Sequence, residues 1–219
     1  TLFKTTNGGN SWANTFVTAS NQNIVTGWSG LGGDRPWSYG ECAFGIEVAR
    51  NDASRVIFGD FGFVHATSNG GQSWRQAYTH ADDEHPAGSN TPAMASYSSI
   101  GLENTSCWQV FWANASQLWA CYSDIRGMRS IDMGEKWSFN YTGHTANTSY
   151  RIAKLANGTL LAGTSNIHDI YQSTYLTDAR LDPTDANGKI IYSTNNGQSW
   201  QLLKQFSHPV FWLATDPNN

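Results

Sequence analysis

Apolar and polar residues alternate along short segments of this chain. The segment Gly45–Ala49 is one example, and alternation of this kind is typical of a β-strand with one covered face. Segments of similar length recur between turns rich in Gly, Asn, Ser and Thr, and no long amphipathic helical pattern interrupts them. The pattern therefore predicts an all-β fold of short strands.

An eight-residue motif recurs four times. Its form is Ser or Thr, any residue, Asp or Asn, any residue, Gly, any residue, then Ser or Lys, and Trp. The four octets are Thr5–Trp12, Thr67–Trp74, Ser130–Trp137 and Ser193–Trp200. Their tryptophans are separated by 62, 63 and 63 residues. A constant period of this length indicates a repeat architecture.

The residue types of the octet predict a tight β-hairpin turn. The third residue accepts hydrogen bonds from nearby backbone N–H groups, Gly adopts positive φ, and Trp packs between strands. We expect these residues to be structural. They are Asn7, Trp12, Asn69, Trp74, Asp132, Trp137, Asn195 and Trp200.

The octets resemble the Asp-box, or BNR repeat, of sialidases, xyloglucanase-type glycoside hydrolases and sortilin-like receptors. The resemblance implies a β-propeller of four-stranded antiparallel blades, with an octet at each turn between the third and fourth strands. Three of the octets have Asn where the family usually has Asp, and Asn can make the same turn bonds. About 3.5 blades are expected in this chain. Such propellers have six to eight blades, so roughly half of the ring would be absent from it.

The expected organisation is a single partial propeller that begins and ends in mid-blade. Residues 1–43 complete a preceding blade and add a long loop, and 210–219 supply the first strand of the next blade. The remaining blades would come from the rest of the chain or from a partner chain. The three full blades are expected over 44–78, 108–141 and 150–205. Their predicted strands are 44–49, 56–60, 63–68 and 73–78; 108–112, 118–123, 127–131 and 137–141; and 150–155, 159–164, 189–194 and 200–205.

The charge and the sequons of the chain indicate which classes of partner and which cellular location to expect. Charged residues make up 14% of the chain, the net charge is −4, and no Lys/Arg block could follow a phosphate backbone, which argues against nucleic acid. The longest apolar runs have strand length, so no membrane span is expected. Five Asn-X-Ser/Thr sequons favour a secreted or cell-surface glycoprotein, if the host glycosylates. They start at Asn104, Asn114, Asn140, Asn147 and Asn157.

Three cysteines do not form a disulfide framework. Cys42 and Cys107 each immediately precede the first strand of a predicted blade, and an exported chain could join them by a disulfide. Cys121 would then be a buried thiol in a strand.

By the same resemblance, ligands would lie on the face formed by the second-to-third-strand turns and the loops between blades. Asp60 and Asp124 occupy equivalent positions in two such turns. Paired carboxylates facing a sugar are what acid/base glycoside hydrolysis requires, which makes these residues the candidate catalytic pair. The alternative is that each Asp caps its turn through backbone N–H bonds.

Further residues on that face suit carbohydrate. The loop 27–37 contains Trp28, Asp34, Arg35 and Trp37; exposed Trp rings stack on pyranose rings, and Asp/Arg pairs bind hydroxyls. In the alternative interpretation the tryptophans pack the loop against the blades. Other candidate substrate-binding residues are Arg126, His168 and Asp169.

The run His80–His85 is a weak candidate for a Ca²⁺ site, because Asp82, Asp83 and Glu84 offer oxygen ligands. A solvated acidic loop is the alternative. No other metal and no organic cofactor is expected.

The segment Ser149–Ala153, followed by Asn157–Ala162, resembles the sialidase Arg-Ile-Pro strand and its downstream Gly-Thr-Leu-Leu-Ala, and this resemblance implies that Arg151 would grip a substrate carboxylate. Ala153 replaces the Pro, however, and the segment follows three octets instead of preceding them. The segment 121–132 resembles secreted bacterial BNR-repeat proteins that are glycosyl-hydrolase-like. That resemblance implies a polysaccharide or glycan partner. Two functions remain open: a glycoside hydrolase, or a non-catalytic glycan-binding, adhesive or structural propeller of a glycosylated extracellular assembly.

Overall fold

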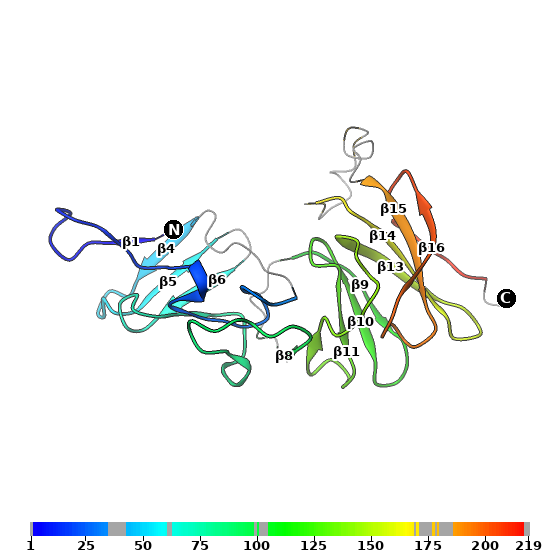
Figure 1. The fold of residues 1–219 in the computed structure, drawn as a ribbon, viewed down its shortest axis with the longest axis horizontal. Coiled ribbons are helices and arrows are strands. Elements are labelled where there is room, and N and C mark those ends of the chain that lie inside the picture. The colour runs from blue at the N-terminus through cyan, green and yellow to red at the C-terminus, as the bar shows by residue number, and fades with distance from the viewer. Residues whose placement is uncertain are drawn as a thin grey trace. The chain divides into compact units, whose positions relative to one another are not determined.

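The computed structural model confirms the all-β fold (Figure 1). It describes residues 2–34, 43–60, 63–98, 100, 105–168, 170, 177, 179 and 186–216. The chain divides into two compact units, residues 1–104 and 105–219. No closed ring is found among the described residues.

Unit 1 contains one blade and a separate hairpin. The blade is an antiparallel meander of β4 (Gly45–Val48), β5 (Val56–Gly59), β6 (Val64–Thr67) and β7 (Trp74–Gln76), and β3 (Ile24–Val25) runs parallel to β7. The hairpin pairs β1 (Phe3–Lys4) with β2 (Ala13–Asn14). The short elements η1 (Ala19–Asn21), η2 (Ala81–Asp83) and β8 (Ser96–Tyr97) lie in the connections.

Unit 2 contains two neighbouring blades. The first is β9 (Cys107–Trp112), β10 (Leu118–Tyr122), β11 (Gly127–Ser130) and β12 (Trp137–Ser138). The second is β13 (Thr148–Lys154), β14 (Leu160–Ser165), β15 (Gly188–Ser193) and β16 (Gln201–Phe206). The first strand of the second blade, β13, contacts both β9 and β10, so the two blades pack on each other.

The segment predicted to begin another blade is not a strand. Residues 210–216 lie along β13 and β14, but these described residues make one backbone hydrogen bond to the two strands, from Val210 N to Thr164 O (3.3 Å). The Thr215 hydroxyl adds a side-chain bond to Lys154 O (3.1 Å). One backbone bond does not make a ladder, which is why an apolar, strand-length sequence fails to become a strand here.

The four octets form the same hydrogen-bonded turn. In the last one, Ser193 Oγ donates to Asn195 Oδ1 (2.8 Å) and accepts from Gly197 N (2.9 Å), while Asn195 Oδ1 accepts from Ser199 N (2.9 Å). The other three octets repeat each of these bonds. The Gly at the fifth position has φ between +82° and +94° in all four, a conformation that favours glycine. The turn chemistry predicted from the sequence is therefore present in every repeat.

Two of the octet tryptophans are buried against the preceding repeat. Trp200 is 4% exposed, and its ring meets Trp119 edge to face at 5.3 Å. Trp74 donates from Nε1 to Thr15 O (2.6 Å) and packs on Phe16. Trp12, by contrast, is 60% exposed. In these two repeats the octet Trp therefore packs against the preceding repeat.

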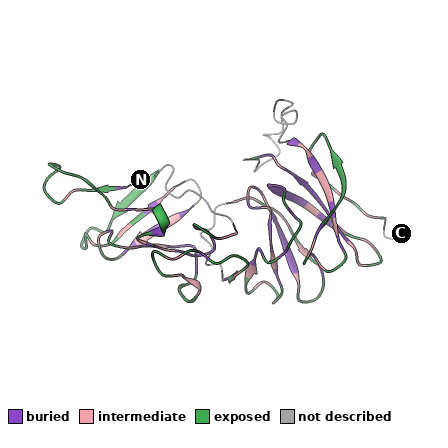
Figure 2. Cartoon of the chain, in the orientation of Figure 1, coloured by how far each residue is buried: buried purple, intermediate pink, exposed green. Residues whose placement is uncertain are grey.

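Burial follows this arrangement. Figure 2 shows buried residues concentrated on the central strands of the blades, for example β10 and β14, while β4 and β16 are exposed along their whole length. Unit 1 also buries a polar side chain: His65 is fully buried and stacks on Phe58 at 5.0 Å. Its Nε2 lies 3.8 Å from Asp60 Oδ2. Burial lowers the pKa of His65 to about 4, although the Asp60 charge opposes the shift.

Replacing Gly197 with Ala tests the octet packing. A Cβ at this position would overlap the Trp119 ring, whereas a Cβ at Gly158, which also has positive φ in unit 2, would meet no atom within 4 Å. Gly158→Ala should cost about 1–2 kcal/mol from backbone strain alone. Gly197→Ala should cost about 1–3 kcal/mol more because of overpacking. Denaturant unfolding of both variants measures the difference, and equal costs would contradict the packing described.

The pKa of His65 predicts a pH dependence of stability. Because folding depresses this pKa, the neutral imidazole stabilises unit 1 fully above pH about 6.5, and this contribution is lost as the pH falls toward about 4. His65→Phe should remove that part of the acid sensitivity, while His80→Gln, at an exposed His in unit 1, should not. Unfolding midpoints measured from pH 7 to pH 4.5 check this. An unchanged profile for His65→Phe would show the assignment to be wrong.

Candidate functional site

Asp60 closes its own turn in unit 1. Its Oδ1 accepts from Phe63 N (2.7 Å), its N donates to Phe63 O (2.9 Å), and its side chain is 4% exposed. Its other carboxylate oxygen faces the buried His65. This is the turn-capping role that the sequence left as the alternative to catalysis, since a substrate cannot reach Asp60 while the turn stays closed.

Asp124 occupies the equivalent turn after β10 but is more open. Its side chain is 25% exposed, and its Oδ1 accepts from Asn147 Nδ2 (2.8 Å). The same oxygen lies 3.7 Å from His168 Nδ1, and this imidazole is 67% exposed. The structure therefore brings together two of the predicted site residues, one from each blade of unit 2.

Asn147 holds this arrangement in place. Its Nδ2 also donates to Ile167 O (3.0 Å), and its backbone N donates to Asn166 Oδ1 (3.3 Å). The Thr148 hydroxyl adds a bond to Ile167 O (3.2 Å). These bonds fix the residues just before His168, at the start of the connection between β14 and β15. Sequence reasoning missed this role because Asn147 begins a sequon.

The other described sequon asparagines are in different surroundings. Asn114, Asn140 and Asn157 are exposed, whereas Asn147 is 9% exposed and its Nδ2 is fully engaged. A glycan on Asn147 would replace one of the two Nδ2 hydrogens and so break the bond to Asp124 or the bond to Ile167. Asn104 lies outside the described residues.

Arg126 adds a cation to the same turn. Its backbone bonds to the next blade, from Arg126 N to Asn147 O (2.8 Å) and from Ser149 N to Arg126 O (3.1 Å). Its Nε is buried, and the guanidinium has no hydrogen-bond or ion-pair partner in the described part of the chain. We refer to Asp124, Arg126, Asn147 and His168 as the Asp124 cluster.

A small apolar cluster supports the Asp124 cluster. Ile167, Ile170 and Ala186, from the two ends of the connection between β14 and β15, pack against Trp108 of β9. Trp108 Nε1 donates to Ser123 Oγ (2.8 Å), next to Asp124, and Ser123 Oγ donates to Ile170 O. Tyr150 packs edge to face on Trp108 at 5.1 Å, and burial raises its pKa to about 12. The tyrosine therefore stays a neutral hydroxyl at physiological pH.

The loop proposed as a sugar platform has a structural role in its described part. Trp28 is 5% exposed and packs on Phe63 and Tyr78, with ring centres 5.8 Å apart in each case. This burial contradicts a role for Trp28 as an exposed stacking surface and matches the alternative, packing of the loop. Asp34 Oδ2 accepts from Met94 N (2.7 Å) and ties the loop down. Arg35, Trp37 and Asp169 lie outside the described residues.

The acidic run in unit 1 is used for protein contacts. Asp83 Oδ2 accepts from Ser98 N (2.7 Å), Glu84 pairs with Arg75 (2.8 Å), and Asp82 faces solvent. These carboxylates do not converge on one point as a Ca²⁺ site requires. No group of three His, Cys, Asp or Glu side chains that could hold a metal ion occurs among the described residues.

Two cysteines are described as thiols. Cys107 is exposed, and Cys121 is buried, with its pKa raised by that burial. Cys42 lies outside the described residues, so the Cys42–Cys107 disulfide stays a prediction.

Arg151, the residue similar to a sialidase arginine, is engaged by an aromatic ring. Its guanidinium carbon lies 3.9 Å from the centre of the Trp212 ring, a cation–π contact.

In the described ranges, no helix has the length and apolar character needed to cross a bilayer.

Comparison with known proteins gives only distant structural likenesses. No protein-family model matches the chain, and no curated protein matches it. An ancestral GH74 enzyme has a TM-score of 0.33 and 13% identity over 74% of this chain and 25% of its own. The GH74 enzyme of Niastella koreensis has a TM-score of 0.33 and 13% identity, over 91% of this chain and 25% of its own. YCF48 from Cyanidioschyzon merolae has a TM-score of 0.26 and 11% identity, over 73% and 55%. This chain thus spans about a quarter of the length of the GH74 enzymes.

Removing the Asn147 side chain tests whether it organises the Asp124 cluster. Asn147→Ala removes the amide donor to Asp124 Oδ1 and one of the two donors to Ile167 O, so unit 2 should lose about 1–3 kcal/mol of stability. The NMR signals of the His168 ring should also shift. Asn140→Ala, at an exposed sequon Asn of the same unit, should stay within about 0.5 kcal/mol of wild type. Denaturant unfolding and imidazole NMR measure both effects, and an unmoved His168 signal would contradict the role given to Asn147.

Proposed function

We propose that this chain belongs to a secreted, carbohydrate-directed β-propeller that binds a glycan at the Asp124 cluster. The observation that carries the proposal is the half-open Asp124 carboxylate, which lies between the Asn147 amide and the exposed His168 imidazole. The resemblance of the four octets to the Asp-box supports the same class of ligand.

The chemistry of the cluster suits sugar hydroxyls. A hydroxyl both donates and accepts hydrogen bonds, so it is best bound where acceptors and donors lie side by side. Asp124 supplies carboxylate acceptors, while the exposed His168 ring supplies a nitrogen from the adjoining blade that can donate or accept. Because Asn147 fixes the carboxylate before a ligand arrives, little ordering is left for the binding step.

Glycoside hydrolysis is the second candidate. It is favoured by one observation, the partly exposed carboxylate–imidazole pair at 3.7 Å, since Asp and His are among the side chains that act as general acids and bases in enzymes. Asp60 is buried in its own turn, so Asp124 is the better candidate for a catalytic carboxylate. Hydrolysis would also require a second carboxyl group beside Asp124, whereas glycan binding would not.

Asp124→Asn tests both candidates in the full-length protein. The Asn keeps an acceptor for Asn147 but loses the charge, and hydrogen bonds to charged groups contribute about 1.5–3 kcal/mol. Glycan affinity should therefore fall roughly 10- to 100-fold. Glu135→Gln removes the same charge from an exposed position of unit 2 and should bind like wild type.

Binding is measured on a panel of plant, algal and bacterial polysaccharides, with release of reducing ends followed in parallel. Release that Asp124→Asn abolishes would establish a hydrolase, whereas binding without release would support the non-catalytic function. Wild-type affinity in Asp124→Asn would remove the Asp124 cluster from the proposal.

A further inference from the structure

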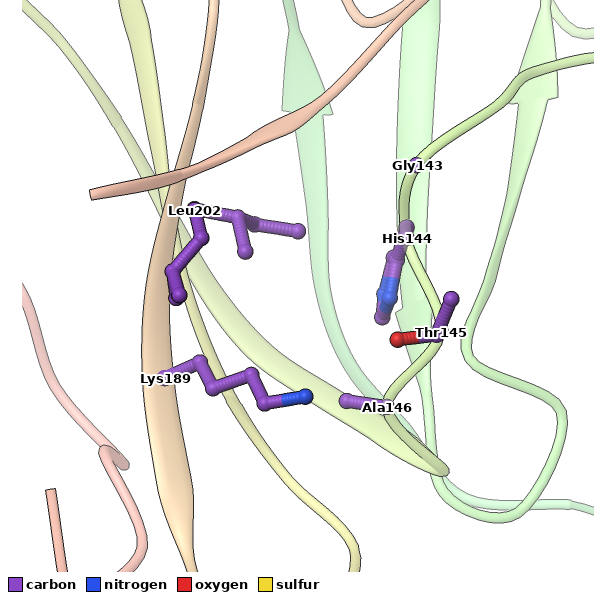
Figure 3. A pocket seen from close by; sticks show the side chains of 7 residues that line it. Gly143, His144, Thr145, Ala146, Lys189 and Leu202 are labelled. Carbon is purple, nitrogen blue, oxygen red and sulfur yellow. The ribbon is translucent and has the colours of Figure 1, made fainter. Parts of the chain in front are cut away.

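A small pocket lies in unit 2, beside the segment that joins its two blades. The pocket has a volume of about 70 Å³ and lies between residues 143–146 and the strands β15 and β16 (Figure 3). Its walls include His144, Thr145, Ala146, Lys189, Ile191 and Leu202. None of these residues belongs to an octet or to the Asp124 cluster.

The pocket contains a lysine ammonium group that pairs with no carboxylate among the described residues. Lys189 Nζ has no hydrogen bond or ion pair with the residues that the structure describes, whereas Lys4 and Lys154 each donate to a backbone carbonyl. In Figure 3 the end of the Lys189 side chain and the Thr145 hydroxyl point into the same space. A cation and a hydroxyl donor facing one small cavity are what an anionic group needs.

The wall opposite Lys189 is held rigidly. Thr142 bonds to the last octet on both sides, from Thr142 N to Gln198 O (3.1 Å) and from Trp200 N to Thr142 O (2.9 Å). Gly143 has φ +80° and passes so close to the Trp200 backbone that a Cβ would overlap it. His144 is buried, with Nε2 2.5 Å from Ser149 Oγ. The pocket is therefore already formed in the unbound protein.

Apolar side chains complete the lining. Ala146 and Ile191 are buried, and Leu202 covers another wall. Apolar walls reduce the screening of a charge by water, so an anion beside Lys189 is attracted more strongly than at an open surface. Because the chain has a net charge of −4 and does not attract anions as a whole, the attraction for an anion is confined to the surroundings of Lys189.

The pocket is connected to the Asp124 cluster through a single segment. Residues 143–146 line the pocket, and the next residue, Asn147, donates to Asp124. The pocket and the Asp124 cluster therefore lie along the same segment between the two blades, where one glycan could contact both.

We infer that the Lys189 pocket binds an acidic substituent, a uronate carboxylate or a sulfate ester, of the glycan. A cavity of about 70 Å³ holds a few water-sized groups, since a water molecule occupies about 30 Å³ of the liquid. It is therefore large enough for a charged substituent. The inference rests on the proposed function and adds that the glycan is anionic.

The test compares matched acidic and neutral polymers with the full-length protein. Polygalacturonate is compared with the same polymer after reduction of its carboxyl groups, and a sulfated galactan with its desulfated form. Wild type should prefer one acidic polymer to its neutral counterpart by about tenfold, as expected for one charge-assisted hydrogen bond. The pair that shows the preference distinguishes carboxylate from sulfate.

Lys189→Gln should abolish that preference and leave the affinity for the neutral polymer unchanged. Lys189→Arg, which keeps the charge, should retain it. Lys204→Gln removes a charge from an exposed position of β16 outside the pocket and should behave like wild type. Circular dichroism checks that each variant is folded.

The outcomes separate this inference from the proposed function. Asp124-dependent binding with no preference for acidic polymers would overturn the inference and leave the proposed function standing. A preference that survives in Lys189→Gln would also overturn it, because the charge would then be recognised elsewhere. Absence of binding to every polymer would overturn both.

Discussion

The octet turn is the interaction on which both units depend. Its Ser or Thr hydroxyl and its Asn or Asp side chain bind three backbone N–H groups that a tight turn would otherwise leave unsatisfied. The turn joins the third and fourth strands of a blade and places the Trp at the start of the fourth. Where Trp200 then meets Trp119, a local hydrogen-bonded turn becomes a contact between blades. The position of β13 beside β9 and β10 follows, and with it the juxtaposition of Asp124 and His168.

The third and seventh residues of the octet are chemically matched. In the three octets with Asn, the amide Nδ2 donates to a Ser hydroxyl at the seventh position, at 2.8–2.9 Å. In the octet with Asp132 this amide is absent, and the seventh residue is Lys136. Burial raises the pKa of Asp132, but hydrogen bonds from Lys136 N and the Ser130 hydroxyl, with the charge of Lys136, outweigh it and lower the pKa overall. Asn with Ser and Asp with Lys are thus two solutions to the same turn, which explains why the change from Asp to Asn leaves the geometry intact.

The sequence predicted what depends on local chemistry. The octet turns and the strands of the three blades follow from turn residues and alternation, and the structure contains them. Features decided by tertiary contacts were not predictable in this way. Trp28 is buried because Phe63 and Tyr78 lie against it, and no local pattern distinguishes that from an exposed ring. Asn147 matches a sequon, yet its role follows from which residues of the next connection face it.

The pairing of site residues shows the same limit. Sequence register made Asp60 the partner of Asp124, whereas the structure gives Asp124 an imidazole, His168, from a connection whose position no local pattern determines. The imidazole approaches because Asn147 and Thr148 both bind Ile167 O. A residue outside the motif therefore decides which candidates meet.

The difference between Asp60 and Asp124 also explains where a site can form. The turn after β5 is closed by Phe63, which bonds to both the backbone and the carboxylate of Asp60. The turn after β10 has two non-glycine residues in the left-handed region, Asp124 at φ +62° and Arg126 at φ +71°. Each costs on the order of 1–3 kcal/mol. The compensating bonds come from the neighbouring blade, through Asn147 and Ser149. That turn is therefore stabilised by the neighbouring blade, and the Asp124 carboxylate at this junction keeps 25% of its surface exposed.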